Sequence, residues 1–290
     1  CSSDLFNSLR EIFKMRKILL ASTALVAMSV TAAQADISIS GSVSFEVADD
    51  GTTTTFVDDS NLMITGGRSM DNGVNATVAM NITGGAAAAV AEDTYIDLSG
   101  DFGSVRMGDT DDALDRMDGV NPANWDNEGI AQAGTSMAIG GDGDANISFI
   151  SPSISGATVY GATTAEGANT GMGINYTAGP VTVMAQSGQN GTSEENLMAA
   201  EMTFSGIRVG FSAGTTQATQ ATAKVKYRAM GAQYTMGAAK LTATSQKLVG
   251  GDTYSNVGVA YTVAPGMSVV LESGSQEAES GTYAHLNVTF

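Results

Sequence analysis

The chain has 290 residues, with 30 Asp and Glu against 13 Lys and Arg, and a formal net charge of −17 at pH 7. This excess of negative charge repels nucleic acids and anionic surfaces and attracts cations. The single cysteine excludes a fold held together by disulfide bonds.

Residues 15–35, MRKILLASTALVAMSVTAAQA, have the three parts of a secretory signal. Arg16 and Lys17 precede a short apolar segment, and small residues up to Ala35 form a cleavage signal. The apolar segment is too short to cross a bilayer, which takes about 20 residues. We predict export with cleavage after Ala35, and we interpret residues 1–14 as upstream read-through. An amphipathic N-terminal helix is the alternative.

Residues 1–35 hold four of the basic and two of the acidic residues, so the mature chain carries about −19.

The mature chain begins with an alternating segment, ADISISGSVSFEV, at residues 35–47. Ile37, Ile39 and Val43 fall on one parity, while Ser38 and Glu46 fall on the other. A period of two predicts a strand with one apolar and one polar face. The apolar face meets either lipid or a protein core, and the polar face meets either bulk water or an enclosed channel.

Four later segments repeat one pattern, in which a tight turn with Gly or Pro joins two alternating runs. These β-hairpin signatures are GINYTAGPVTVMAQ, AAEMTFSGIRVGFSA, MGAQYTMGAAKLTATS and VGVAYTVAPGMSVVLES. Longer polar stretches separate them, and upstream short turns near 67–73, 99–103 and 151–156 continue the alternation. The pattern predicts about 16 strands of 9–11 residues. It is typical of an all-β transmembrane antiparallel β-barrel with short periplasmic turns and long extracellular loops, formed by residues 36–290 as one domain.

A soluble β-sandwich or solenoid also has short strands at regular spacing and remains the alternative fold. Against it, connection lengths differ systematically between the two ends of the strands. One Trp and nine Phe are few for a soluble core of this size. No apolar run of 18 residues follows Ala35, which excludes helical membrane spans.

Three further segments carry a family resemblance. The C-terminal YAHLNVTF places Leu286, Val288 and Phe290 on one parity and resembles the assembly signature of outer-membrane barrels. The segments DTYIDLSGDFGSVRMGD and ANISFISPSISGATVYGA resemble strand pairs of Gram-negative general porins. The resemblance spans residues 36–290. It implies a 16-stranded barrel, a homotrimer, and a third loop, here residues 109 to about 143, that folds into the lumen.

This longest strand-free stretch is acidic, and a soluble domain rarely contains such a loop unless it is functional. The resemblance makes it the rim of a pore constriction, where like charges concentrate counter-ions. The alternative is a solvated acidic surface loop. Trp125 and Pro122 are expected to pin the loop to the wall, or Trp125 simply anchors an exposed loop. The candidate rim residues are Asp109, Asp111, Asp112, Asp115, Asp118, Asp126 and Glu128.

Basic residues are predicted to line the channel wall opposite the acidic loop. By parity, Val225, Tyr227 and Ala229 are expected to face outward, which puts a basic ladder on the lumen face. Lys or Arg on the lipid face costs roughly 2–4 kcal/mol at the midplane, which alone would turn such residues inward. We predict a transverse field between this wall and the acidic loop. The candidate wall residues are Arg106, Arg208, Lys224, Lys226 and Arg228.

Other candidate sites are weaker. GGDGDAN resembles one turn of a calcium-binding repeat, with Asp142 and Asp144 as ligands, but its register is off and it does not recur, so a flexible loop is the favoured interpretation. His285, the only histidine, is expected to face the lumen and has no second His or Cys for a metal site. No nucleophile elbow is present. We therefore expect no enzymatic activity and no cofactor, except for a possible loop-bound calcium ion.

The sequence thus predicts an outer-membrane porin for passive diffusion of small hydrophilic solutes and ions, with mild cation preference. The expected partners are two further copies of the chain, outer-membrane lipid and lipopolysaccharide, and the permeating solutes, with no nucleic acid. A substrate-specific channel and a non-conducting structural or adhesive surface barrel remain the alternatives. A soluble calcium-binding β-protein is the third.

Overall fold

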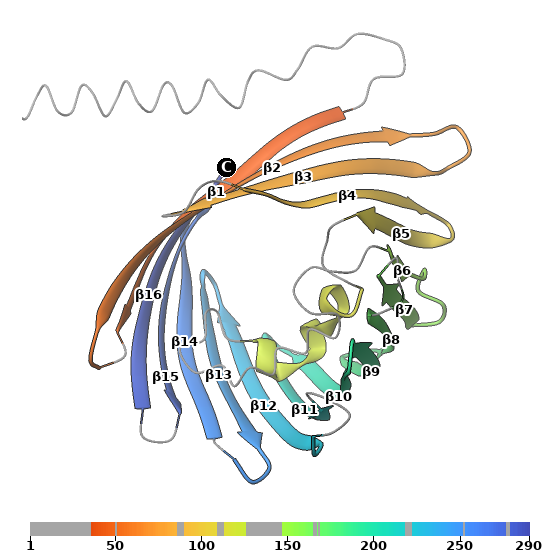
Figure 1. The fold of residues 1–290 in the computed structure, drawn as a ribbon. Helices are drawn as coiled ribbons and strands as arrows, with labels where there is room; N and C mark the ends of the chain where they lie inside the picture. Colours follow the sequence, from red (N-terminus) through yellow and green to blue (C-terminus); the bar gives the residue numbers. More distant parts are fainter. Residues whose placement is uncertain are drawn as a thin grey trace, which may run out of the picture.

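The computed structural model describes residues 36–49, 51–85, 90–108, 113–125, 147–164, 167, 169–217, 222–251, 253–276 and 279–290. Sixteen antiparallel strands form one closed barrel in which each strand pairs with its neighbours in sequence and β1 pairs with β16 (Figure 1). The sequence-based prediction of the fold is confirmed. No helix among these residues is long and apolar enough to cross a membrane.

The first eight strands are β1 (Asp36–Asp49), β2 (Thr54–Ser69), β3 (Asn75–Gly85), β4 (Val90–Gly100), β5 (Gly103–Gly108), β6 (Ile147–Ile150), β7 (Ala157–Thr163) and β8 (Asn169–Ala178). The second eight are β9 (Val181–Asn190), β10 (Ser193–Phe204), β11 (Ile207–Gln217), β12 (Val225–Met236), β13 (Ala239–Leu248), β14 (Thr253–Ala264), β15 (Met267–Gln276) and β16 (Glu279–Thr289). Two short 3-10 helices, η1 (Asp115–Val120) and η2 (Pro122–Asn124), lie between β5 and β6.

The two ends of the barrel differ. One end, here called the turn end, carries Asp36 and Phe290 and tight hairpins such as Ser205–Gly206, whose φ angles of 49° and 80° are both positive. Positive φ at both central residues matches the twist of the flanking strands and favours a two-residue hairpin. The opposite end, here called the loop end, carries the β5–β6 connection. Its other connections are shorter than the sequence suggested, because the strands extend into the polar stretches: β9 ends at Asn190 and β10 begins at Ser193.

The seam between the first and last strands closes the barrel. The Phe290 backbone N–H donates to the Gly41 carbonyl at 3.0 Å, and the Gly41 N–H donates back to the Phe290 carbonyl at 3.1 Å. Leu286, Val288 and Phe290 share the outward face here, and the Phe290 side chain is 60% exposed. Their role in barrel assembly stays a prediction.

The two faces of the first strand are as the alternation predicted. Ile37, Ile39 and Phe45 are more than half exposed on the outside, whereas Glu46 lies inside, opposite His285. A continuous exposed apolar outer face is expected where lipid replaces water.

Candidate functional site

The interior of the barrel holds the described part of the β5–β6 connection, residues 113–125, called here the inward segment (Figure 1). Its two helices contact the inner face of β9–β13. Leu114 and Asn121 are fully buried, and Trp125 is 3% exposed. The segment therefore packs against one wall of the barrel.

The apolar part of this packing includes Leu114. It belongs to one buried hydrophobic cluster with residues from the inner faces of four strands, which in sequence order are Tyr160, Met184, Leu197, Ala199 and Tyr227. A Cβ atom at Gly171 would collide with the Leu114 side chain, so a glycine on β8 makes room for it. This wall is a local hydrophobic core inside a barrel.

Trp125 lies flat against the wall at the other end of the segment. A Cβ atom would stand 2.5 Å from its ring at Gly210 and 2.9 Å from it at Gly231, so only glycine permits this approach at both positions. The indole Nε1–H donates to the Gly119 carbonyl at 3.0 Å, and Gln233 Nε2 donates to the Trp125 carbonyl at 3.1 Å. The prediction that Trp125 pins the loop to the wall is confirmed.

Polar bonds hold the rest of the segment. Asn175 Nδ2 donates to the Met117 carbonyl at 3.0 Å, and Ser212 Oγ donates to Asn121 Oδ1 at 2.6 Å. Asn121 Oδ1 also accepts from the Ala123 N–H and so caps η2. Buried polar groups paired in this way fix one orientation of the segment.

Arg208 links the wall to the segment. Its guanidinium pairs with Glu201, with Nε 2.8 Å from Oε2, and also donates to the Gly119 carbonyl. The guanidinium carbon lies 4.0 Å from the centre of the Trp125 ring, a favourable cation–π distance. Arg208 therefore faces the lumen, but its charge is neutralised by Glu201 and serves to hold the segment.

Arg106 also lies on the inner face, where Nε is 3.2 Å from Asp97 Oδ2 and the guanidinium carbon lies 3.9 Å from the centre of the Tyr95 ring. Ser104 Oγ donates to the same carboxylate at 3.0 Å. Arg116, the cation of the inward segment, reaches Ser148 on neighbouring β6 at 3.4 Å. Both arginines near β5 and β6 thus have partners on the wall.

The predicted orientation of β12 is wrong: the residues expected to face outward face inward, and the reverse. Tyr227 and Ala229 face inward, with exposed fractions of 1% and 2%, whereas Lys226 and Arg228 are exposed on the outer surface. The parity argument assumed that the inner face of β12 meets water, but this face packs against the apolar side of the inward segment. Apolar side chains therefore turn inward, and the basic ones turn outward.

Contrary to the prediction from the sequence, Lys224 does not face the lumen either. It lies just before β12 and is 3.1 Å from Glu194, which shares the outward parity of β10. Because β12 packs directly against η2, the supposed basic wall is neither opposite the acidic loop nor in the lumen. The hypothesis of a transverse field built on Lys224, Lys226 and Arg228 is therefore wrong.

The predicted acidic rim is only partly described. Asp115 and Asp118 fall in η1, which lies inside the barrel. Asp109, Asp111, Asp112, Asp126 and Glu128 lie outside the described residues, as do Asp142 and Asp144. Within the described part of the chain, no three His, Cys, Asp or Glu side chains gather closely enough to hold a metal ion.

The opposite inner wall, formed by β14–β16 and β1–β3, is polar. His285 lies there as expected, with Nε2 4.0 Å from Glu46 Oε1 and its ring edge-on to Tyr283 at 5.9 Å. Register places Asp59 beside Ser44 and Glu272 beside Tyr283 on the same inner face. Sequence reasoning singled out neither acid, although both share the polar parity of their strands.

Comparisons with known proteins agree with this architecture. The sequence matches the family model described as Gram-negative porin over residues 21–281. The chain belongs to the Gram-negative porin family. A multiply substituted Rhodobacter blastica porin has a TM-score of 0.71 at 17% identity, covering 88% of this chain and all of that one. The trimer form of OmpT, an outer membrane protein of Vibrio cholerae, has a TM-score of 0.74 at 11% identity, covering 89% of this chain and all of that one. No curated protein matches the sequence.

Membership in this family makes the protein an outer-membrane porin. The turn end is then the periplasmic end and the loop end the extracellular end, as in the predicted fold. The exposed apolar strand faces are the lipid-facing surface, and the interior is the channel side.

Proposed function

We propose that this porin allows passive diffusion of small hydrophilic solutes and ions. The observation that carries the proposal is the asymmetric interior, in which the inward segment packs against β9–β13 and leaves the inner face of β14–β16 and β1–β3 polar. Water and solutes pass along such a polar wall without a cofactor or an energy source.

We further propose mild cation preference. On the described inner face, Arg106 and Arg208 are paired with Asp97 and Glu201, so these four groups cancel. Glu46, Asp59 and Glu272 line the polar wall, and no Lys or Arg lies on that inner face among the described residues. Lys240 on the inner face of β13 reduces this negative charge without reversing it. A passage with an excess of one sign of charge concentrates counter-ions, here cations.

The working unit is proposed to be a homotrimer, exported with cleavage after Ala35. The family membership and the fold shared with a trimeric OmpT support it. Ile37, Ile39 and Phe45 give β1 an exposed apolar face that either a neighbouring subunit or lipid can cover.

Single-channel conductance of the folded mature protein in a planar bilayer, with a salt gradient across it, tests all three points. Stepwise openings in groups of three and a reversal potential of cation-preferring sign are expected. Membrane insertion without conductance would overturn the diffusion channel and favour a surface barrel. Saturable block by one solute would favour a substrate-specific channel.

A further inference from the structure

Two neighbouring strands of the inner wall, β13 and β14, carry buried side chains with unpaired polar atoms. Thr242, Gln246 and Asn256 are 4%, 8% and 3% exposed. Within the described residues, neither Nδ2 nor Oδ1 of Asn256 has a hydrogen-bond partner, and the same holds for Thr242 Oγ1 and Gln246 Nε2. Unpaired buried polar groups are costly, and each one in a native structure needs an explanation.

These three side chains, called here the amide cluster, lie together on the inner face. Asn256 pairs in register with Thr244, so Thr242 and Gln246 are its two diagonal neighbours on β13. Diagonal neighbours on one face of a sheet lie about 7–8 Å apart, a distance that one small solute can bridge. Because β13 also contacts η2, the cluster lies where the polar wall meets the inward segment.

An aromatic ring and bare backbone border the amide cluster. Tyr254 pairs in register with Gln246 and is buried on the same inner face. On the other side, Asn256 pairs with Gly274, which in turn pairs with Gly281 on β16. Neither glycine has a side chain, so no side chain of β15 or β16 competes for the Asn256 amide at this level.

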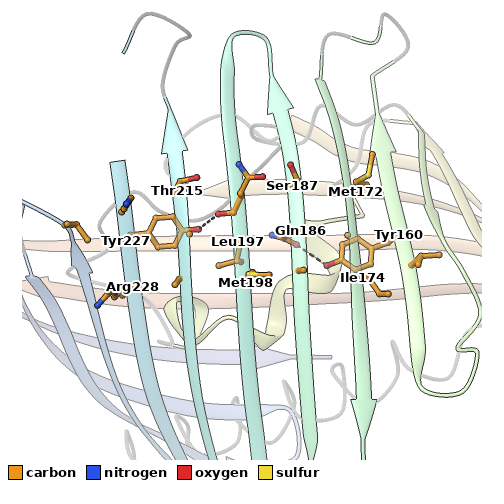
Figure 2. A pocket seen from close by; sticks show the side chains of 18 residues that line it. Tyr160, Met172, Ile174, Gln186, Ser187, Leu197, Met198, Thr215, Tyr227 and Arg228 are labelled. Atoms are coloured by element: carbon orange, nitrogen blue, oxygen red, sulfur yellow. Dashed lines mark hydrogen bonds between the residues drawn. The ribbon is translucent and has the colours of Figure 1, made fainter. Parts of the chain in front are cut away.

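The wall behind the inward segment is built differently. There the Tyr160 hydroxyl donates to Gln186 Oε1 at 3.2 Å, and the Tyr227 hydroxyl donates to the Asn196 carbonyl at 3.4 Å (Figure 2). Those two hydroxyls are satisfied within the protein. Because the part of the chain that the structure describes gives the amide cluster no such partners, the missing hydrogen bonds point to the channel side.

The donors and acceptors of the amide cluster select the class of ligand. A cation binds acceptors only and an anion binds donors only, so either would leave one half of the Asn256 amide unpaired. A hydroxyl group both donates and accepts, so a solute with several hydroxyls can satisfy the oxygen and the nitrogen together. The ring of Tyr254 adds an apolar surface, which suits the C–H face of a sugar ring better than it suits water.

We propose that the amide cluster binds a neutral polyhydroxylated solute, a small sugar, at the extracellular mouth of the channel. Its hydroxyls bridge Asn256 to Gln246 and Thr242, and its C–H face packs against Tyr254. Gln246 is the third residue of β13 from the loop end and Asn256 the fourth residue of β14, so a solute entering from outside meets the cluster early. The inference rests on the proposed function, in which the interior is a diffusion channel, and adds a preferred class of solute to it.

The test measures glucose binding to the folded mature protein in detergent by saturation-transfer NMR. The control solute is tetraethylene glycol dimethyl ether, which is of similar size and has no hydroxyl. Asn256→Leu replaces the amide by an apolar side chain of similar size. Asn287→Leu is the matched control, because Asn287 also faces inward with an unpaired Oδ1 but lies at the level of Thr262, near the turn end.

Saturable glucose binding is expected in the wild type and in Asn287→Leu, and at least tenfold weaker binding in Asn256→Leu. A site built to hydrogen-bond a hydroxyl discriminates strongly when one side of the pair is lost. Gln246→Leu is expected to weaken binding severalfold. Galactose is expected to bind about as well as glucose, since the cluster recognises hydroxyl groups and the channel stays general. The ether is expected to bind weakly and equally to all variants.

Stability separates a binding site from a structural one. Removing an unpaired buried amide is nearly neutral or stabilising, so the free energy of unfolding of Asn256→Leu in urea is expected to equal or exceed that of the wild type. The proposal is overturned if Asn256→Leu binds glucose as tightly as Asn287→Leu. It is also overturned if the wild type binds glucose no better than the ether, which would assign water as the partner. Glucose binding by a protein that inserts without conducting would uphold this site and overturn only the diffusion channel.

Discussion

The two halves of the barrel wall use the same alternating strands in opposite ways. On β1 and β16, polar side chains face inward and apolar ones face lipid. On β12, the inner face carries Tyr227 and Ala229, and the outer face carries Lys226 and Arg228. The first half borders a polar interior and the second borders the inward segment, so the environment on each side decides the parity of a strand.

The largest expected effect comes from breaking the apolar inner contact of β12. Replacing Tyr227 by Ala leaves a cavity in the buried cluster that also contains Leu114 and Leu197, and large aromatic truncations of this kind cost about 3–5 kcal/mol. Tyr234→Ala removes an outward tyrosine, 41% exposed, from the same strand and is the matched control. The free energy of unfolding in urea, measured in detergent, is expected to fall far more for Tyr227→Ala. Equal losses would contradict the assigned parity.

The second-largest effect is expected from removing Trp125, which anchors the inward segment. Trp125→Ala removes the ring contacts with Gly210 and Gly231 and the cation–π contact with Arg208. Losing ~3 kcal/mol of packing shifts the balance between docked and undocked segment by roughly 100-fold. We expect noisier single channels with a changed mean conductance, while the barrel itself stays folded.

Conservative replacement separates anchoring from simple destabilisation of the barrel. Trp125→Phe keeps an aromatic surface against the two glycines but loses the N–H that donates to Gly119. It is expected to conduct with noise intermediate between wild type and Trp125→Ala. Wild-type conductance in Trp125→Ala would show that the segment is held without this anchor.

Measuring ion selectivity tests the role of the charges on the polar half of the barrel wall. Replacing Glu46 by Gln and Asp59 by Asn removes two inward negative charges, and the reversal potential in a salt gradient is expected to move toward zero. Glu194→Gln removes an outward acid of the same type at the loop end and is the control. An unchanged reversal potential in the double variant would assign selectivity to other residues.

The sequence predicted the barrel and its 16 strands because alternation and turn chemistry are local, whereas the inward loop was expected only from the family resemblance. It did not predict what the loop touches, since the partners of Leu114 come from strands distant in sequence. One signal was present: Gly171 and Gly173 on β8, and Gly210 and Gly214 on β11, recur on the inner face two or four residues apart. Such rows of glycine indicate a wall that another segment approaches closely.

The parity error on β12 has a similar source. The alternation was assigned from its first residues, where Lys226 and Arg228 suggested a polar lumen. Its second half carries Met230, Tyr234 and Met236 on the same parity as these two cations, and Gln233 on the other. Considered over its whole length, the strand favours the observed orientation, because an apolar outer face is required only at depth in the bilayer.

The smallest expected effect therefore concerns the residues that the alternation alone assigned to the pore. Charge reversal of Lys226 and Arg228 to Glu places two negative charges on the outer surface, separated from the channel by the wall. In a bilayer of phosphatidylcholine alone, the reversal potential is expected to stay at the wild-type value. A matched reversal of the inward Lys240 to Glu is expected to increase the cation preference, since its charge lies on the inner face. A large shift in the first variant, with none in the second, would mean that β12 is turned the other way in the membrane.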